Sequence, residues 1–368
     1  MYRLPGYPFV IGTIGNICNN WIPPLLILQV LVDLAVVYLL WKSLKRFGSF
    51  RYIPVIVYLM HPYTITFSMY ITPASLTGLF VMSTFYFETR QKLSIYIKSI
   101  LIGLMISLGI LFRPMLMYAG VMYGAYYFIR WLFDRKFKYL ISIVIVIAFS
   151  NVATLSMRYH NANNLAFDEV SSESGNELVR RLLRQSGEMT INEARIWARD
   201  TQIRFTDSLG VVDYTARDSV FSSEIKRLIL QHPLPIIGEH LFMWLRLFTP
   251  EQKYLAPNDF YLASPVILRI LSYIFVAVSF LFLLSGMVLG TFMRTNDRNR
   301  ELSILGLLWF QYFAVIHAKL AYSYYAVPFM GVWIAAGYIG WSSYLNRNNG
   351  RFPRMEDFLR KIANLSLF

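Results

Sequence analysis

Three basic residues, Arg3, Arg113 and Lys319, lie in short segments next to apolar runs, each within a few residues of a tyrosine. Arginine and lysine bind phosphate through charge-assisted hydrogen bonds. Together with Tyr7 and Tyr322 they form a candidate substrate-binding site for a phosphate group. The alternative is that these cations snorkel toward water within an interfacial belt of aromatic residues. The residue types leave both interpretations open.

Carboxylates, which serve as general bases in many enzymes, are scarce near these cations. The short segments on the same predicted side, 1–20, 68–73, 111–115 and 317–322, contain no Asp or Glu. Asp33 lies in the middle of the first apolar run, with Gln29 one helical turn earlier on the same face. An ionisable residue inside a membrane is a candidate functional residue, and the alternative is a hydrogen-bonded packing residue. The catalytic residue is therefore unknown from the sequence.

The sequence predicts no metal and no cofactor. The five histidines and the single Cys18 do not form HExxH or Cys/His ligand spacings. Walker A, helix-opening GxGxxG and GxSxG motifs are also absent from the sequence. This argues against an ATP-driven transporter and an α/β hydrolase.

The composition indicates a polytopic membrane protein. Of the 368 residues, 56% are hydrophobic and only 15% are charged, whereas soluble domains carry about 25% charged residues. The net charge of +14 is explained by basic loops on the cytoplasmic side, so we expect membrane lipids and no nucleic acid as partners.

Nine apolar runs are predicted to be transmembrane helices, which gives an all-α fold. They are 21–41, 52–68, 74–88, 96–112, 115–130, 139–157, 264–290, 302–317 and 322–345. Several are shorter than the about 20 residues that a spanning helix needs. The pattern therefore predicts a polytopic helical protein of about nine spans.

Loop charges predict the orientation of these spans. Basic residues gather at 42–51, 90–92, 130–138, 294–300 and in the tail 346–368, while the alternate short loops carry few. By the positive-inside rule the first set is cytoplasmic. We therefore expect a multi-pass protein of the cytoplasmic (inner) membrane, with the N-terminus outside and the C-terminus inside.

One long polar segment, 158–262, falls on the predicted outer face. Thr190 and Glu193 have capping-box spacing, and Phe221, Ile225, Leu228 and Ile229 repeat at helical spacing before Pro233. The expected organisation is membrane helices in 1–157, a mostly helical outer loop in 158–262, membrane helices in 263–345 and a basic tail in 346–368.

Several motifs, in order along the chain, resemble those of polytopic glycosyltransferases of the GT-C type, the superfamily of protein mannosyltransferases and aminoarabinose transferases. The first is YRLPGYP at 2–8, which is similar to the family's R-x-PGYP segment. Others are GLMISLGILFRPMLM at 103–117, ILQHPLPIIGEHLFMWL at 229–245 and AYSYYAVPFMGVWIAAGYIGW at 321–341.

The resemblance implies a glycosyltransferase of the cell envelope that takes a sugar from a polyprenyl-phosphate-linked donor at the outer membrane face. It places Arg113, and more weakly Lys319, at the donor phosphate. The acceptor, whether glycan, lipid or protein, is left open. The family's catalytic Asp would lie upstream of Met1, so we expect a shortened, impaired member.

Two other functions remain open. One is a surface-polysaccharide polymerase or ligase that relies on residues of the large outer loop, namely Arg158, His160, Arg180, Arg181 and Arg184. The other is a non-catalytic transporter or assembly subunit. The latter is disfavoured because the two halves show no symmetry of the kind that many transporters have.

Overall fold

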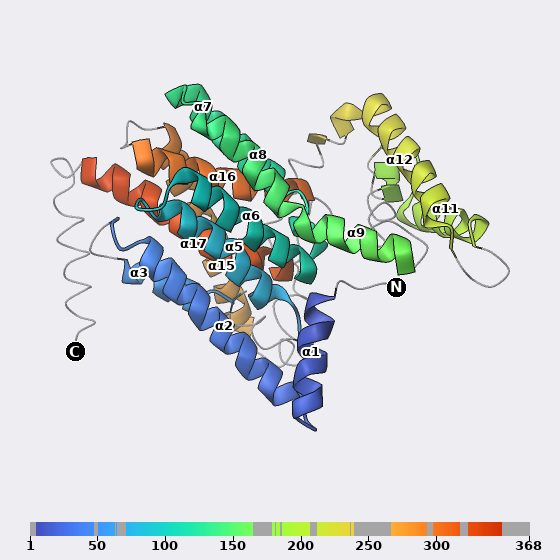
Figure 1. Cartoon of the computed structure of the whole chain (residues 1–368), viewed down its shortest axis with the longest axis horizontal. Helices are drawn as coiled ribbons and strands as arrows, with labels where there is room; N and C mark the ends of the chain where they lie inside the picture. Colours follow the sequence, from blue (N-terminus) through green and yellow to red (C-terminus); the bar gives the residue numbers. More distant parts are fainter. Residues whose placement is uncertain are drawn as a thin grey trace.

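The computed structural model describes residues 5–47, 51–62, 64, 71–164, 179–180, 182–184, 186–206, 212–235, 237–238, 266–292, 297–316 and 323–347. Within these ranges the regular elements are helices, and the only β-type pairing is an isolated bridge between Thr206 and Val212. The predicted all-helical fold is confirmed. Figure 1 shows most of the helices in one bundle, with α11 (Ile191–Arg204) and α12 (Tyr214–Gln231) set apart from it.

A helix occupies at least part of each predicted apolar run. The helices in these runs are α2 (Ile22–Ser43), α3 (Tyr52–Met60), α5 (Ala74–Thr89), α6 (Ile95–Phe112), α7 (Ala119–Asp134), α8 (Lys138–Ser150), α9 (Val152–Asn164), α15 (Val266–Phe292), α16 (Asp297–Ile316) and α17 (Ser323–Arg347). Among the described residues, four stretches are long and apolar enough to cross a membrane: Ile22–Ser43, Ile95–Phe112, Lys138–His160 and Ile274–Phe292. These four indicate a membrane protein.

Two of the expected continuous helices are interrupted. The predicted run 52–68 is interrupted, because α3 stops at Met60 and His61 is extended before Pro62, as a residue preceding proline prefers; residues 65–68 lie outside the described ranges. The predicted run 139–157 lies within the apolar stretch Lys138–His160, but its helix is divided at Asn151 into α8 and α9. The Asn151 amide donates to the Ile147 carbonyl at 2.8 Å, and such local bonds compete with helical ones. Helix α9 then continues to Asn164, beyond the expected start of the outer loop at 158.

Two prolines and a glycine within residues 2–8 predict a turn, but the structure has a helix here. Gly6 is the first residue of α1 (Gly6–Ile17), and Pro5 is its N-cap. Proline is tolerated at this end because the first amides of a helix have no partner within the helix. The PGYP sequence therefore starts a helix.

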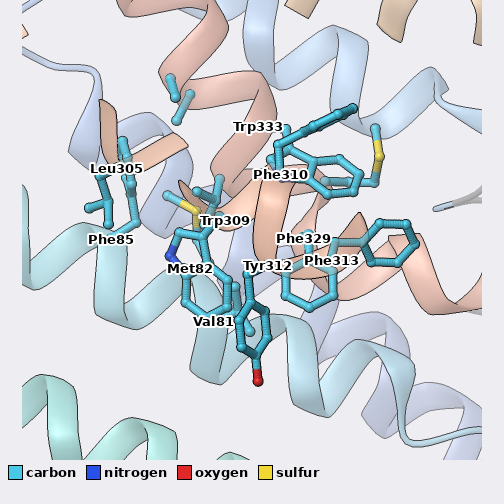
Figure 2. Close-up of a cluster of buried hydrophobic side chains, with 14 of the residues drawn as sticks. Val81, Met82, Phe85, Leu305, Trp309, Phe310, Tyr312, Phe313, Phe329 and Trp333 are labelled. Atoms are coloured by element: carbon cyan, nitrogen blue, oxygen red, sulfur yellow. The ribbon is translucent and has the colours of Figure 1, made fainter. Parts of the chain in front are cut away.

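Helix α17 lies at the centre of the bundle, where it packs against α5, α15 and α16. Its residues from 326 to 336 are all buried. Figure 2 shows the aromatic cluster on one side of it, in which Trp333 lies near Phe310, Phe313 and Phe329. Aromatic pairs of this kind contribute about 0.5–1.5 kcal/mol each beyond their buried area.

Helices α15 and α17 cross at glycines. Gly286 and Gly290 form a GxxxG pattern on α15 and face Gly337 and Gly340 on α17. A Cβ atom at Gly337 would lie 2.9 Å from the Leu283 carbonyl oxygen, and one at Gly340 would overlap the carbonyl of Gly286. Small residues allow membrane helices to approach this closely.

The predicted cytoplasmic segments gather at one end of the bundle. Arg46 hydrogen-bonds to Gln91, and Ser342 donates to the carbonyl of Phe47 at 2.6 Å. The start of α16 contacts the end of α5 through Arg298. The segments that were predicted to lie on the same side of the membrane therefore lie at the same end of the helix bundle.

Helices α11 (Ile191–Arg204) and α12 (Tyr214–Gln231) belong to the long polar segment and lie apart from the main bundle in Figure 1. They have their own small core, made of Val179, Leu182, Leu183, Ala194, Phe221 and Leu228. The predicted capping box is confirmed, since Thr190 and Glu193 exchange both hydrogen bonds at the start of α11. Of the residues that repeat at helical spacing, Phe221 and Leu228 are buried, whereas Ile229 is 47% exposed.

An ion cluster ties the turn before α11 to α12. Arg227 contacts Glu188 at 2.5 Å and Glu224 at 2.7 Å, and His232 Nε2 lies 2.8 Å from Glu188. The hydrogen bonds from Arg227, and then that from His232, lower the pKa of the Glu188 carboxyl below its usual range. A lowered carboxyl pKa stabilises the folded state above the unfolded pKa of about 4.3 and loses that effect as the pH falls.

We therefore expect Glu188→Gln to loosen this turn at neutral pH but not in acid. The measurement is hydrogen exchange of the amides at 186–189, corrected for the intrinsic rate at each pH. Protection should be lower in the variant at about pH 6, and the two proteins should converge below about pH 4. A difference that stays constant down to pH 3 would contradict the ionic origin of the contact.

Candidate functional site

The structure brings together two of the predicted site residues, Tyr7 and Arg113. The first turn of α1 packs against the last turn of α6, and Gly6 makes this possible because a Cβ there would lie 2.7 Å from the Leu111 carbonyl oxygen. Arg113 follows Phe112 directly as the C-cap of α6. The PGYP and RP motifs are thus neighbours in space although about a hundred positions separate them in sequence.

Arg113 is held in place by the chain that follows it. The predicted helix end is confirmed, because Arg113 is extended before Pro114 and the chain continues as the short 3-10 helix η1 (Pro114–Leu116). Its side chain is 6% exposed, and its Nη1 lies 3.8 Å from the Met115 sulfur. The hydroxyl of Tyr312 donates to the carbonyl of Met115, which connects α16 to the site.

Tyr7 faces both Arg113 and α2. Its hydroxyl donates to Gln29 Oε1 at 2.9 Å. Burial raises the pKa of Tyr7 to about 12, and the nearby Arg113 charge acts in the opposite direction. The phenol is therefore a protonated hydrogen-bond donor at neutral pH. Arg113 supplies a guanidinium that can bind an oxyanion, and the single hydroxyl proton of Tyr7 could join it only by leaving Gln29.

Asp33 lies one helical turn further along α2 than Gln29. Its carboxylate accepts a hydrogen bond from Ser75 at 3.0 Å and one from Tyr58 at 3.5 Å. These bonds connect α2 to α5 and α3. This is the geometry of the hydrogen-bonded packing residue that the sequence offered as one of two interpretations.

The remaining predicted site residues are not all described. Arg3, Lys319 and Tyr322 lie outside the described residues, as does Arg181. Of the outer-loop residues named for the alternative function, Arg158 and His160 are exposed on α9. Arg180 and Arg184 flank the small core of the loop helices.

A second polar cluster, which the sequence analysis missed, lies at the opposite end of the bundle. Glu88, in the last turn of α5, is completely buried. Its carboxylate lies 3.0 Å from Arg130 of α7 and 3.1 Å from Arg298 of α16. The hydroxyls of Tyr126 and Tyr127 donate to it at 3.3 and 3.2 Å. A buried carboxylate needs such partners.

The surrounding residues complete this cluster. Glu301 contacts Arg130 at 3.0 Å and Arg298 at 2.9 Å. Lys98 of α6 donates to the Glu88 carbonyl at 3.4 Å. Charge is thus paired across α5, α6, α7 and α16. Because each carboxylate oxygen is already occupied, this arrangement suits a structural clamp better than a binding site.

In comparisons with protein-family models, curated proteins and solved structures, nothing matches this chain. The functional argument therefore depends on the residues and their geometry. In the part of the chain that the structure describes, no group of three His, Cys, Asp or Glu side chains could hold a metal ion. The Tyr7–Arg113 pair remains the candidate functional site, since it joins two sequence motifs and offers donors to an anion.

Proposed function

We propose that this chain is an integral-membrane glycosyltransferase that binds a polyprenyl-phosphate-linked sugar donor. The observation that carries the proposal is the contact between the PGYP helix start and the end of α6, which places Tyr7 beside the buried Arg113. Arg113 neutralises the donor phosphate, and Tyr7 orients it by transferring its hydrogen bond from Gln29 to a phosphate oxygen. Stabilising charge on a departing lipid phosphate is a main route to such transfer.

In the proposed topology the nine helical ranges cross the cytoplasmic membrane, and the Tyr7–Arg113 site lies at its outer face. The support is the segregation of charge. The basic segments meet at one end through contacts such as Arg46–Gln91, whereas Tyr7 and Arg113 lie at the other. This orientation places α11 and α12 outside, where they are available to an acceptor.

Replacing Arg113 tests the proposal. Arg113→Gln should weaken binding of a long-chain polyprenyl phosphate to the full chain in nanodiscs by about tenfold or more, because a hydrogen bond to a charged group contributes about 1.5–3 kcal/mol. Arg113→Lys should retain part of the affinity. Binding is measured by titration with the lipid and native mass spectrometry of the complexes.

The matched control is Lys92→Gln, which removes an exposed positive charge at the opposite end of the bundle. This variant should bind like the unaltered protein. If Arg113→Gln binds the lipid phosphate as tightly as Lys92→Gln does, Arg113 is not at the donor site and the proposal fails.

A further inference from the structure

A polar pocket of about 340 Å³ lies on α11, well apart in sequence from the Tyr7–Arg113 site. It is lined by Arg180, Arg195, Ala198, Arg199, Gln202, Ile203 and Thr206. Three of its seven lining residues are arginines. This concentration of one charge around a single concavity is the observation that the proposed function does not use.

The helical spacing of α11 explains how the pocket is formed. Arg195 and Arg199 are four residues apart, so their side chains leave the same face of the helix, and Gln202 continues that face. Ala198 is 1% exposed, and Ala194, one turn earlier on α11, packs into the small core of the loop helices. Arg180 comes from the segment whose neighbours Val179 and Leu182 are buried in the same core. The three arginines therefore lie on α11 and on a segment that both pack into the small core.

Four described carboxylates near the loop helices are engaged elsewhere, while Asp200, which follows Arg199 on α11, is exposed. Glu188 and Glu224 bind Arg227, Glu193 caps α11, and Asp213 caps α12 by accepting from the Ala216 amide. Among the described residues no carboxylate forms an ion pair with Arg195 or Arg199. The positive charge of these two guanidiniums is thus not neutralised by the described part of the protein.

We propose that this pocket binds a phosphate-bearing ligand, either a diphosphate or a phosphomonoester, through Arg195, Arg199 and Arg180. A guanidinium presents parallel N–H donors that match phosphate oxygens in pairs. The side-chain amide of Gln202 adds a neutral donor. The site is separate from the one proposed for the lipid donor, and it does not depend on transferase activity.

Pyrophosphate is the probe, titrated calorimetrically into the full chain in phosphatidylcholine nanodiscs at about 0.15 M salt. The double variant Arg195→Gln/Arg199→Gln should bind it at least tenfold more weakly, because two charge-assisted contacts are lost. The matched control, Arg204→Gln/Lys226→Gln, removes two exposed charges from the same helices outside the pocket. It should bind like the unaltered protein.

Two results would overturn the proposal: no pyrophosphate binding by the unaltered protein, or equal affinities of the two double variants. Arg195→Lys/Arg199→Lys checks folding and should retain part of the affinity. Repeating the titration in phosphatidylglycerol nanodiscs identifies the source of the phosphate. Weaker pyrophosphate binding there means that lipid headgroups compete for the pocket, and unchanged binding means that it takes a soluble phosphate ester.

Discussion

Replacing Glu88 by glutamine is expected to destabilise the whole helix bundle by about 3–5 kcal/mol, the cost of removing one partner from a buried ion pair. Glu88 is completely buried and accepts from both Arg130 and Arg298. The neutral amide would leave these two guanidiniums with Glu301 as their remaining close carboxylate in the described cluster. The measurement is unfolding of the purified protein in mixed micelles with increasing SDS.

Asp297→Asn is the matched control, since Asp297 is 85% exposed and its ion pair with Arg300 lies at the same end of the bundle. Exposed pairs contribute about 0–1 kcal/mol, so this variant should unfold almost like the original. Adding Arg130→Met to Glu88→Gln should recover part of the lost stability, because it removes one uncompensated charge. Equal stability of Glu88→Gln and Asp297→Asn would show that the cluster is not a clamp.

The second large effect is expected from Gly340→Leu. Any side chain at this position overlaps the backbone of Gly286, so α15 and α17 must move apart. Membrane helices depend on close packing for their association, and overpacking typically costs about 1–3 kcal/mol. We place this variant at the upper end of that range, because backbone atoms cannot move aside as side chains can. The destabilisation would be detected as a loss of monodisperse protein on size-exclusion chromatography.

Gly12→Leu provides the comparison for this substitution. A Cβ atom at Gly12 on α1 meets nothing within 4 Å, so the added side chain has open space. This variant should elute as the unaltered protein does. If Gly340→Leu also behaves normally, the close approach of α15 and α17 is not required for the fold.

Local signals in the sequence predicted much of the fold. Apolar runs gave the helix ranges, and the spacing of Thr190 and Glu193 gave the start of α11. Arg113 before Pro114 gave the end of α6. Each of these features depends on residues close together in the chain, which is why they could be read without a structure.

The predictions failed where the local structure depends on contacts between residues far apart in the sequence, or on competing local contacts. The break at Asn151 is accompanied by a bond from its side-chain amide to the Ile147 carbonyl, one helical turn earlier. The prolines of PGYP could serve a turn or a helix start, and packing of Gly6 against Leu111 accompanies the second. In the sequence Glu88 is only the last residue of an apolar run. Its ion cluster was missed because its two arginine partners lie 42 and 210 positions away. The glycosyltransferase activity and its polyprenyl-phosphate-linked donor stay untested predictions.

The separation between Glu88 and its partners also bears on how the protein is made. Helix α5 leaves the ribosome long before α7, and α16 follows only after the long polar segment has been synthesised. Until then the carboxylate of Glu88 lacks one or both of its guanidinium partners, and its burial would be costly. The end of α5 must therefore stay hydrated during early membrane insertion. Closing of the bundle around Glu88 is a late step of biogenesis, which waits for Arg298 to arrive.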